Sequence, residues 1–276
     1  MYLRTFLFLL LFCMLTISRT ASAEEQELVF GLPPYANPTV TYESFVPLIT
    51  WLSSYIGHDI RISVAPNNIT HVTRVGQGEV DLAFMGPSPY VKAQRNFATI
   101  EPLAKFVYSD EAINRVVIIT AEDSKIKDFD DLIGTTFAFG DYHSYGSHFV
   151  PRYILVKNGV QLADLAAYDY LGGHDNVALA VIHGDFDAGG MRHDFFLRYQ
   201  QRGLRVLHGP VIIPPPVIVC RSDMEESIKE KVSHALFSLE ESELLAPINP
   251  AMRGFGQVSD AEFEAARKII NFIESR

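Results

Sequence analysis

The chain has too few cysteines to be built around disulfide bonds. Its 276 residues include two cysteines, and Cys13 lies in an apolar N-terminal stretch that we expect to be removed. Cys220, at the end of the apolar run Val217–Cys220, is then the single thiol of the mature chain, and we predict that it is buried in the core. A disulfide-dense extracellular domain is excluded, and a bacterial periplasmic protein fits better.

The common motifs of catalytic and metal sites are also missing. The sequence contains no HExxH, no GxSxG, no phosphate-binding P-loop and no GxGxxG, and its nine histidines lack paired-ligand spacing. Asp141, His143 and Ser144 are close in one loop, but closeness in sequence does not build a catalytic triad. We therefore predict no catalytic residue, no metal site and no cofactor, and a hydrolase is the enzymatic alternative.

The N-terminal apolar stretch is typical of a secretory signal peptide. Phe6–Ile17 is nearly continuously apolar, Arg4 precedes it, and Ala21–Ala23 offers small residues for cleavage. A membrane-spanning helix needs about 20 apolar residues, so this stretch is too short to be one. We predict a signal peptide over residues 1–23 and a periplasmic mature chain that begins near Glu24.

The mature chain carries a strong excess of acidic residues. The signal segment contains Arg4 and Arg19 and no acid, which leaves 21 basic and 33 acidic residues after cleavage. Such a surface disfavours nucleic acid and anionic membranes as partners. A local site can still attract an anion, because the N-terminus of a helix is electropositive.

Two segments that begin 106 residues apart repeat one pattern. Residues 68–85 and 174–191 each predict a short amphipathic helix, a glycine that ends it, and a short apolar strand preceded by aspartate. This repetition predicts two α/β lobes of similar plan, and a cleft between such lobes commonly binds a small molecule. The alternative is that the glycine and the aspartate only form an ordinary connection between a helix and a strand.

Short apolar strands alternate with helices along the rest of the chain. We predict strands at residues 28–32, 60–64, 82–85, 115–120, 136–139, 204–207 and 217–220. We predict helices at 40–56, 124–134 and about 147–158, and a mostly helical tail from Asp223 to Arg276. The alternation favours α/β layers with largely parallel sheets. The segments near 115–120 and 212–221 are candidates for crossings between the lobes.

Three predicted helices begin with hydroxyl and aromatic residues, at Thr39–Tyr42, Gly86–Tyr90 and Ser144–Ser147. The first turn of a helix offers unpaired N–H groups and the positive end of the dipole, so it can hold an oxyanion. The alternative is that these residues only cap their helices. His174 opens the helix of the second repeat, where it either donates to an anion or caps the helix at the surface.

Four segments resemble motifs of the phosphonate- and phosphite-binding periplasmic proteins of ABC transporters. They are Gly78–Tyr90, Asp141–Ser144 with Pro151, Gly173–Val177 and Gly184–Gly189, and they stand in the family's order over nearly all of the mature chain. The resemblance implies the type II periplasmic-binding fold. In that α/β fold each lobe is a mixed, largely parallel sheet flanked by helices, two hinge crossings join the lobes, and they close over the ligand.

On this resemblance we assign residues 24–116 and 218–276 to lobe one and residues 117–217 to lobe two. Carried over by position, the ligand contacts are Tyr42, Tyr90, Ser144, Tyr145, Gly146 and His174. The family usually has two further small hydroxyl residues where Tyr145 and Gly146 stand, so the pocket is expected to be smaller or differently shaped.

The resemblance also implies a changed charge at the site. Arg192 and His193 stand where the family often has an acid, Asp194 follows one position later, and Pro215 replaces a further aspartate. If Arg192 and His193 face the ligand, it is more anionic than an aminoalkylphosphonate. If Asp194 takes the acid's place instead, this argument fails.

The function implied is capture of a small phosphorus oxyanion or organophosphonate by a monomeric periplasmic protein, which delivers it to an ABC permease in the inner membrane. The alternatives are the same scaffold binding another small anion, a ligand-sensing partner of a sensor kinase, and an enzyme on the same fold.

Overall fold

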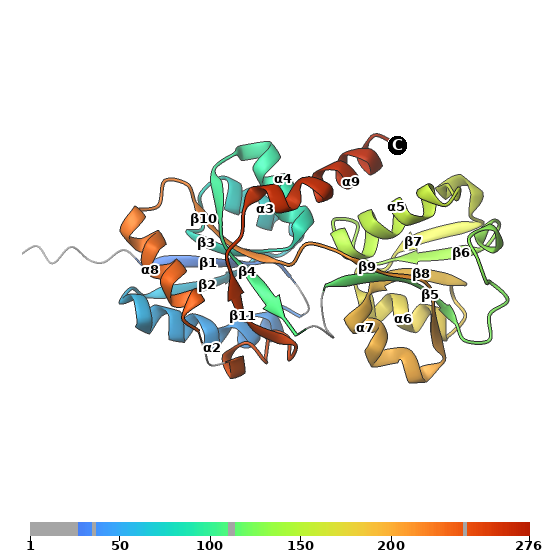
Figure 1. Cartoon of the computed structure of the whole chain (residues 1–276), viewed down its shortest axis with the longest axis horizontal. Helices are drawn as coiled ribbons and strands as arrows, with labels where there is room; N and C mark the ends of the chain where they lie inside the picture. Colours follow the sequence, from blue (N-terminus) through green and yellow to red (C-terminus); the bar gives the residue numbers. More distant parts are fainter. Residues whose placement is uncertain (1–26, 35–36, 110–113, 240–241) are drawn as a thin grey trace, which may run out of the picture.

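The computed structural model describes residues 27–34, 37–109, 114–239 and 242–276, and these form two α/β lobes side by side (Figure 1). One sheet has six strands in the order β11-β4-β10-β3-β1-β2, and the other has five in the order β7-β6-β8-β5-β9. The predicted two-lobed α/β class with mixed sheets is confirmed. The sheets are not largely parallel as predicted, because four strand pairs among the described residues are parallel and five are antiparallel. The predicted signal peptide, residues 1–23, lies outside the described residues. Within the described residues, no helix has the length and apolar character needed to cross a membrane.

Lobe one combines the two ends of the described chain. Strands β1, β2 and β3 run parallel, whereas β10 pairs antiparallel with β3 and β4, and β11 pairs antiparallel with β4. The strands are β1 (Leu28–Leu32), β2 (Ile60–Val64), β3 (Leu82–Met85), β4 (Ile100–Tyr108), β10 (Val217–Arg221) and β11 (Met252–Gly256). The helices are α2 (Pro38–Ile56), α3 (Asn68–Gly76), α4 (Pro87–Phe97), α8 (Glu226–Phe237) and α9 (Glu264–Glu274). Cys220 is buried in β10, as predicted.

Lobe two is formed by the middle of the chain. Strand β6 runs parallel to β7 and β8, and β5 pairs antiparallel with β8 and β9. The strands are β5 (Arg115–Ala121), β6 (Thr136–Phe139), β7 (Ala167–Tyr170), β8 (Ala188–Arg192) and β9 (Leu204–Ile212). The helices are a π-helical turn (Tyr145–Phe149) that continues into α5 (Val150–Lys157), α6 (His174–Ile182) and α7 (His193–Tyr199). The chain leaves lobe one after β4 and returns after β9, and the assigned lobe boundaries at residues 116/117 and 217/218 stay a prediction.

The repeated segments have the same structure in both lobes. They form α3 and β3 in lobe one and α6 and β8 in lobe two, and Gly78 and Gly184 have φ angles of 74° and 76°. Both angles lie in the left-handed region that glycine adopts without a steric penalty. The prediction of a helix, a left-handed glycine and a strand in each lobe is confirmed.

The repeated aspartates have the same role in the two lobes. Asp81 Oδ2 accepts a hydrogen bond from the backbone N–H of Val29 at 2.7 Å, and Asp187 Oδ2 accepts one from the N–H of Thr136 at 2.8 Å. Each carboxylate thereby ties the start of its own strand to the neighbouring parallel strand, β1 or β6. Both aspartates therefore support the sheets structurally.

Several elements differ from the prediction. The helix predicted at 124–134 is limited to a 3₁₀ turn at Asp130–Leu132, because the Asp128 side chain accepts hydrogen bonds from the next N–H groups and competes with the helix. Strand β4 was missed because Pro102 and Lys105 interrupt its pattern, and its pairing with β10 shifts register near Pro102. The edge strand β7 is largely exposed, α7 was not predicted, and β11 interrupts the tail that was expected to be mostly helical.

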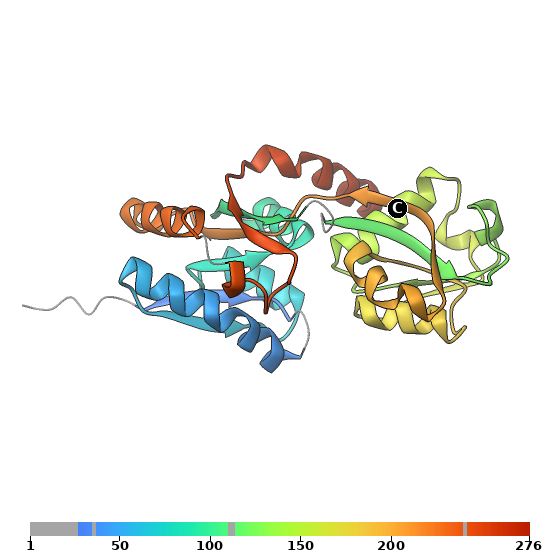
Figure 2. The ribbon, with the colours of Figure 1, turned by 60° about the horizontal axis from the view of Figure 1, so that its bottom comes forward.

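Helix α9 packs against both lobes (Figure 2). It contacts α4 in lobe one and both α5 and the π-helical turn in lobe two, with Ile270 and Ile273 buried. The ring of Phe272 lies 5.4 Å from that of Tyr153 in α5. A motion that opens the lobes therefore has to keep this contact or slide along it.

Candidate functional site

A cavity of about 180 Å³ lies between the lobes. Its walls come from the β1–α2 and β3–α4 connections of lobe one, from the starts of the π-helical turn and α6 in lobe two, and from both crossings. The lining residues are Pro33, Pro34, Asn68, Gly86, Pro87, Pro89, Asn114, Asp141, His143, Ser144, Tyr145, Gly146, Ser147, Gly172, Gly173, His174, Asp175, Arg192, Phe195, Ile213 and Pro216.

The π-helical turn supplies one wall rich in hydrogen-bond donors. Ser144 is its N-cap, and the Ser144 hydroxyl accepts from the N–H of Ser147 at 3.2 Å. The N–H groups of Tyr145 and Gly146 belong to the first turn and have no partner within the helix. The wall can therefore donate two backbone hydrogen bonds to an anion.

Two more helices begin at the same cavity, and neither has a side-chain cap. The N-caps are Gly86 for α4 and Gly173 for α6, so no side chain competes for the first N–H groups. Pro87 and Pro89 have no N–H, and Ser88 supplies the amide between them. The Ser88 hydroxyl is fully buried and has no hydrogen-bond partner among the described residues. Sequence reasoning treated Ser88 only as a helix-starting residue.

His174 is held as a neutral donor. Its Nδ1 accepts a hydrogen bond from the backbone N–H of Arg192 at 3.3 Å, which leaves the proton on Nε2. Burial lowers the pKa of His174 to about 3, and the nearby charge of Arg192 adds to the shift. The ring packs against Phe195 with centroids 4.5 Å apart. His174 can thus donate one hydrogen bond to an anion without carrying a charge.

Arg192 lines the cavity, and its charge is compensated by Asp194. Arg192 Nε donates to Asp194 Oδ1 at 2.9 Å, and Arg192 Nη2 also pairs with Asp194 Oδ2. Burial alone would raise the pKa of Asp194, but the Arg192 guanidinium lowers it overall. A Cβ on Gly146 would lie 3.2 Å from Arg192 Cγ, so the glycine at this position leaves room for the arginine side chain.

One hydrogen bond crosses the cleft beside this pair. Asn249, in the loop before β11 of lobe one, donates from Nδ2 to Asp194 Oδ2 at 3.3 Å. Asp194 therefore accepts hydrogen bonds from its own lobe and from the opposite one. Arg192 was predicted to add positive charge to the site, but Asp194, two residues later, neutralises most of that charge.

The structure brings five of the eight predicted contact residues to the cavity wall. These are Ser144, Tyr145, Gly146, His174 and Arg192. Tyr42, Tyr90 and His193 are not among the lining residues. Tyr42 lies in the first turns of α2 and is 46% exposed, and the ring of His193 stacks on Phe196.

Tyr90 has a structural partner instead. Its side chain is fully buried, its hydroxyl donates to Asp260 at 2.6 Å, and its ring packs on Phe263 at 4.5 Å. The pKa of Tyr90 is raised, first by burial and then by the bond to Asp260. The side chain thus fixes α4 to the segment before α9.

The same substitution, tyrosine to phenylalanine, should have different effects at Tyr42 and at Tyr90. We expect Tyr42→Phe to weaken anion binding by about 1–3 kcal/mol if its hydroxyl reaches the ligand, the usual scale for a hydrogen bond to a charged group. We expect Tyr90→Phe to lower the free energy of unfolding by about 1 kcal/mol and to change affinity less. Titration calorimetry and urea unfolding of both variants check this, and a larger loss of affinity in Tyr90→Phe would contradict it.

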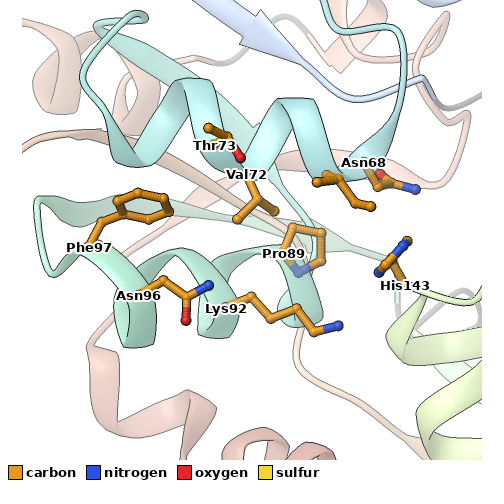
Figure 3. Close-up of a pocket in the computed structure, with 9 residues that line it drawn as sticks. Asn68, Val72, Thr73, Pro89, Lys92, Asn96, Phe97 and His143 are labelled. Carbon is orange, nitrogen blue, oxygen red and sulfur yellow. The ribbon is translucent and has the colours of Figure 1, made fainter.

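Two neighbouring cavities extend the space between the lobes. One of about 300 Å³ shares Asp175, Arg192 and Phe195 with the central cavity. The other, of about 190 Å³, lies between α3 and α4, where His143 of lobe two approaches Pro89 (Figure 3). The cleft is therefore larger than a single oxyanion needs.

The sequence matches one family over most of its length. Residues 30–263 match the family described as ABC transporter, phosphonate, periplasmic substrate-binding protein. A curated relative, the phosphate-import protein PhnD of Mycolicibacterium smegmatis, is 31% identical over an alignment of 183 residues that covers 62% of this chain and 57% of the relative. The match thus spans little more than half of that relative's length.

Solved structures of low identity share the fold. The PhnD1 protein of Prochlorococcus marinus in complex with methylphosphonate has a TM-score of 0.80 at 19% identity, covering 91% of this chain and 100% of that one. A binding component of a phosphonate ABC transporter from Pseudomonas aeruginosa has a TM-score of 0.77 at 21% identity, covering 91% of this chain and 87% of that one. The fold predicted from the motifs is confirmed.

Proposed function

Because the chain belongs to the family of periplasmic substrate-binding proteins of phosphonate ABC transporters, we propose that it captures a small phosphorus oxyanion or an organophosphonate for import. The observation that carries the proposal is the convergence of two helix starts without side-chain caps, the Tyr145 and Gly146 amides and neutral His174 on one cavity between the lobes. N–H groups at helix starts bind an oxyanion without a paired cation.

Each lobe contributes to this binding mode. Ser144, Tyr145, Gly146 and His174 hold the anion from lobe two, and Arg192 flanks it. Tyr42 joins from lobe one as the lobes close. His193 stays a predicted contact, and Tyr90 supports the position of α4.

The matched family consists of periplasmic substrate-binding proteins of ABC transporters. We infer that the signal peptide over residues 1–23 directs export and that the mature protein acts as a monomer. The loaded protein docks on an ABC permease in the inner membrane and performs no reaction on its ligand. Turnover of a bound phosphonate would contradict the last point.

The ligand class can be tested on the purified protein. Mass spectrometry of the released ligand, together with a thermal-shift panel of phosphite, phosphate, methylphosphonate and sulfate, compares the candidates directly. We expect a phosphorus oxyanion to give the largest stabilisation. If sulfate stabilises more than all three phosphorus compounds, the scaffold serves another anion and the proposal fails.

Closure should accompany binding. A ligand held by both lobes stabilises the closed and folded state, by about 2.7 kcal/mol at a hundredfold excess over Kd. We expect saturating ligand to raise the melting temperature and to reduce the radius of gyration in small-angle scattering. A tight ligand that leaves the radius unchanged would show that capture does not involve hinge closure.

A further inference from the structure

The 300 Å³ cavity forms a second compartment of the cleft. Thr41 and Ser44 of α2 and the loop before β11 form its lobe-one wall, and Phe195 and Arg198 of α7 face them from lobe two. It shares Asp175, Arg192 and Phe195 with the central cavity, so the two cavities lie side by side. A substituent on a bound phosphonate that passes these side chains would enter it.

Arg198 is the second base of this compartment. Its guanidinium lies over the ring of Phe195 at 4.4 Å. It has no carboxylate within ion-pair distance among the described residues, although its charge helps to lower the pKa of the nearby Asp194. The two acids on the same walls are already engaged. Asp194 pairs with Arg192, and Asp175 accepts a hydrogen bond from the Tyr199 hydroxyl.

The remaining walls suit a short hydrocarbon spacer. Phe45, Phe84, Ile248 and Met252 line the compartment with apolar surface, and Phe195 adds an aromatic face. An alkyl chain that leaves the central cavity would be covered by these residues, and a polar end group would reach Arg198.

We propose, on the basis of the proposed function, that the second compartment selects organophosphonates whose substituent ends in a carboxylate, with Arg198 as the residue that determines this specificity. The guanidinium offers paired donors that match a carboxylate in geometry and charge. Its exposure keeps the pair partly screened, so the gain in affinity is moderate.

An ammonium group fits the same compartment less well. It would lie near the Arg198 guanidinium, and the like charge disfavours it. Asp194 could attract it, but its two oxygens already accept two hydrogen bonds from Arg192 and one from Asn249. The order of affinity follows as carboxylate, then methyl, then ammonium.

Three phosphonates with the same two-methylene spacer test this order. They are 3-phosphonopropionate, propylphosphonate and 2-aminoethylphosphonate, which end in a carboxylate, a methyl and an ammonium group. We expect Arg198→Gln to weaken binding of 3-phosphonopropionate about two- to fivefold, the upper part of the range for an exposed charge pair, and to leave propylphosphonate within about twofold. Titration calorimetry at one ionic strength measures all nine combinations of the three ligands with wild type and two variants.

The second variant is Arg202→Gln, a matched control. Arg202 follows one turn later, is exposed, lies over the Tyr199 ring at 5.3 Å and is absent from the cavity walls. The Arg202→Gln substitution removes the same net charge as Arg198→Gln but lies outside the cavity walls. It should therefore change the affinity for 3-phosphonopropionate by less than about twofold. An equal loss in both variants would mean long-range attraction and would overturn the role of Arg198.

Other results separate this inference from the proposed function. If propylphosphonate binds and 3-phosphonopropionate binds no better, the selection of a carboxylate is wrong and phosphonate capture stands. If 2-aminoethylphosphonate binds best, Asp194 is the recognising group and the inference is overturned. If phosphate or phosphite binds but none of the phosphonates does, this inference fails and capture of a phosphorus oxyanion stands. If phosphate, phosphite, methylphosphonate and the three test compounds all fail to bind, the proposed function fails, and this inference fails with it.

Discussion

Replacing Ser144 by aspartate is expected to weaken anion binding about a thousandfold while leaving the fold intact. Ser144 caps the π-helical turn, with its hydroxyl accepting from the N–H of Ser147. Aspartate caps helices as well as serine does, so the turn should still form. The new carboxylate would face the bound anion, and two like charges about 4 Å apart repel by about 4 kcal/mol at the effective dielectric near a protein surface.

Ser144→Asn is the control for this change. Asparagine has the same shape as aspartate and is an equally good N-cap, but it carries no charge. We expect it to cost less than about tenfold in affinity, the scale of one neutral hydrogen bond. Titration calorimetry with methylphosphonate and thermal unfolding should be run on both variants. Equal affinities for the aspartate and asparagine variants would remove the 144–147 turn from the anion site.

The predicted contacts that lie at the cavity wall are ones whose position depends on local geometry. Ser144, Gly146 and His174 stand at helix starts, and the pattern that begins a helix is contained in a few consecutive residues. A helix start that follows a strand end also faces the cleft in both lobes, because the two lobes share one plan. The repeated helix, glycine and strand carried that information.

Tyr90, one of the three predicted contacts that do not line the cavity, is held by a residue far away in sequence. Tyr90 was predicted as a contact from its place at a helix start, but its direction is fixed by Asp260, 170 residues later. The pairing of Arg192 with Asp194 and Asn249 joins residues from both lobes. A single sequence shows the residue types in such a cluster, but the partner of each depends on how the lobes pack.

In the fold, too, the elements with a clear local sequence pattern were predicted, and those that depend on neighbouring strands were missed. Strands with uninterrupted apolar runs were predicted, whereas β4 carries Pro102 at a register shift and β7 is an exposed edge strand. Both are stabilised by neighbouring strands more than by their own residues. The two crossings between the lobes were predicted from extended segments. The amphipathic pattern of α9 predicts a helix with one buried face, but it does not show that this face contacts both lobes.

Acidification is expected to destabilise the protein between pH 6.5 and about pH 4, through histidines that are buried in neutral form. His71 in α3 donates from Nε2 to the carbonyl of Phe84 in β3 at 3.0 Å. His148 donates from Nδ1 to the carbonyl of Tyr142 at 2.6 Å and accepts at Nε2 from the Tyr170 hydroxyl. Both side chains are 1% exposed.

Burial is the main cause that lowers the pKa of His71 and of His148 to about 4. The unfolded chain binds a proton at each histidine below about pH 6.5, and the folded protein does so only near pH 4. The unfolded state therefore binds more protons in this window, and the free energy of unfolding falls as the pH falls. Each histidine contributes a slope of about 1.4 kcal/mol per pH unit. His174 at the ligand cavity, with a pKa of about 3, adds in the same direction.

The substitution His71→Gln isolates one of these contributions. A glutamine amide can still donate to the Phe84 carbonyl, which keeps the bond between α3 and β3 but removes the titration. Urea unfolding at several values between pH 7 and pH 4.5 should give a slope about 1.4 kcal/mol per pH unit smaller in the variant than in wild type. Parallel slopes would mean that His71 is not buried in neutral form. Because His71 occupies the helix of the first repeat and His174 starts that of the second, the same measurement on His174→Gln, with and without methylphosphonate, compares a structural histidine with one at the ligand site.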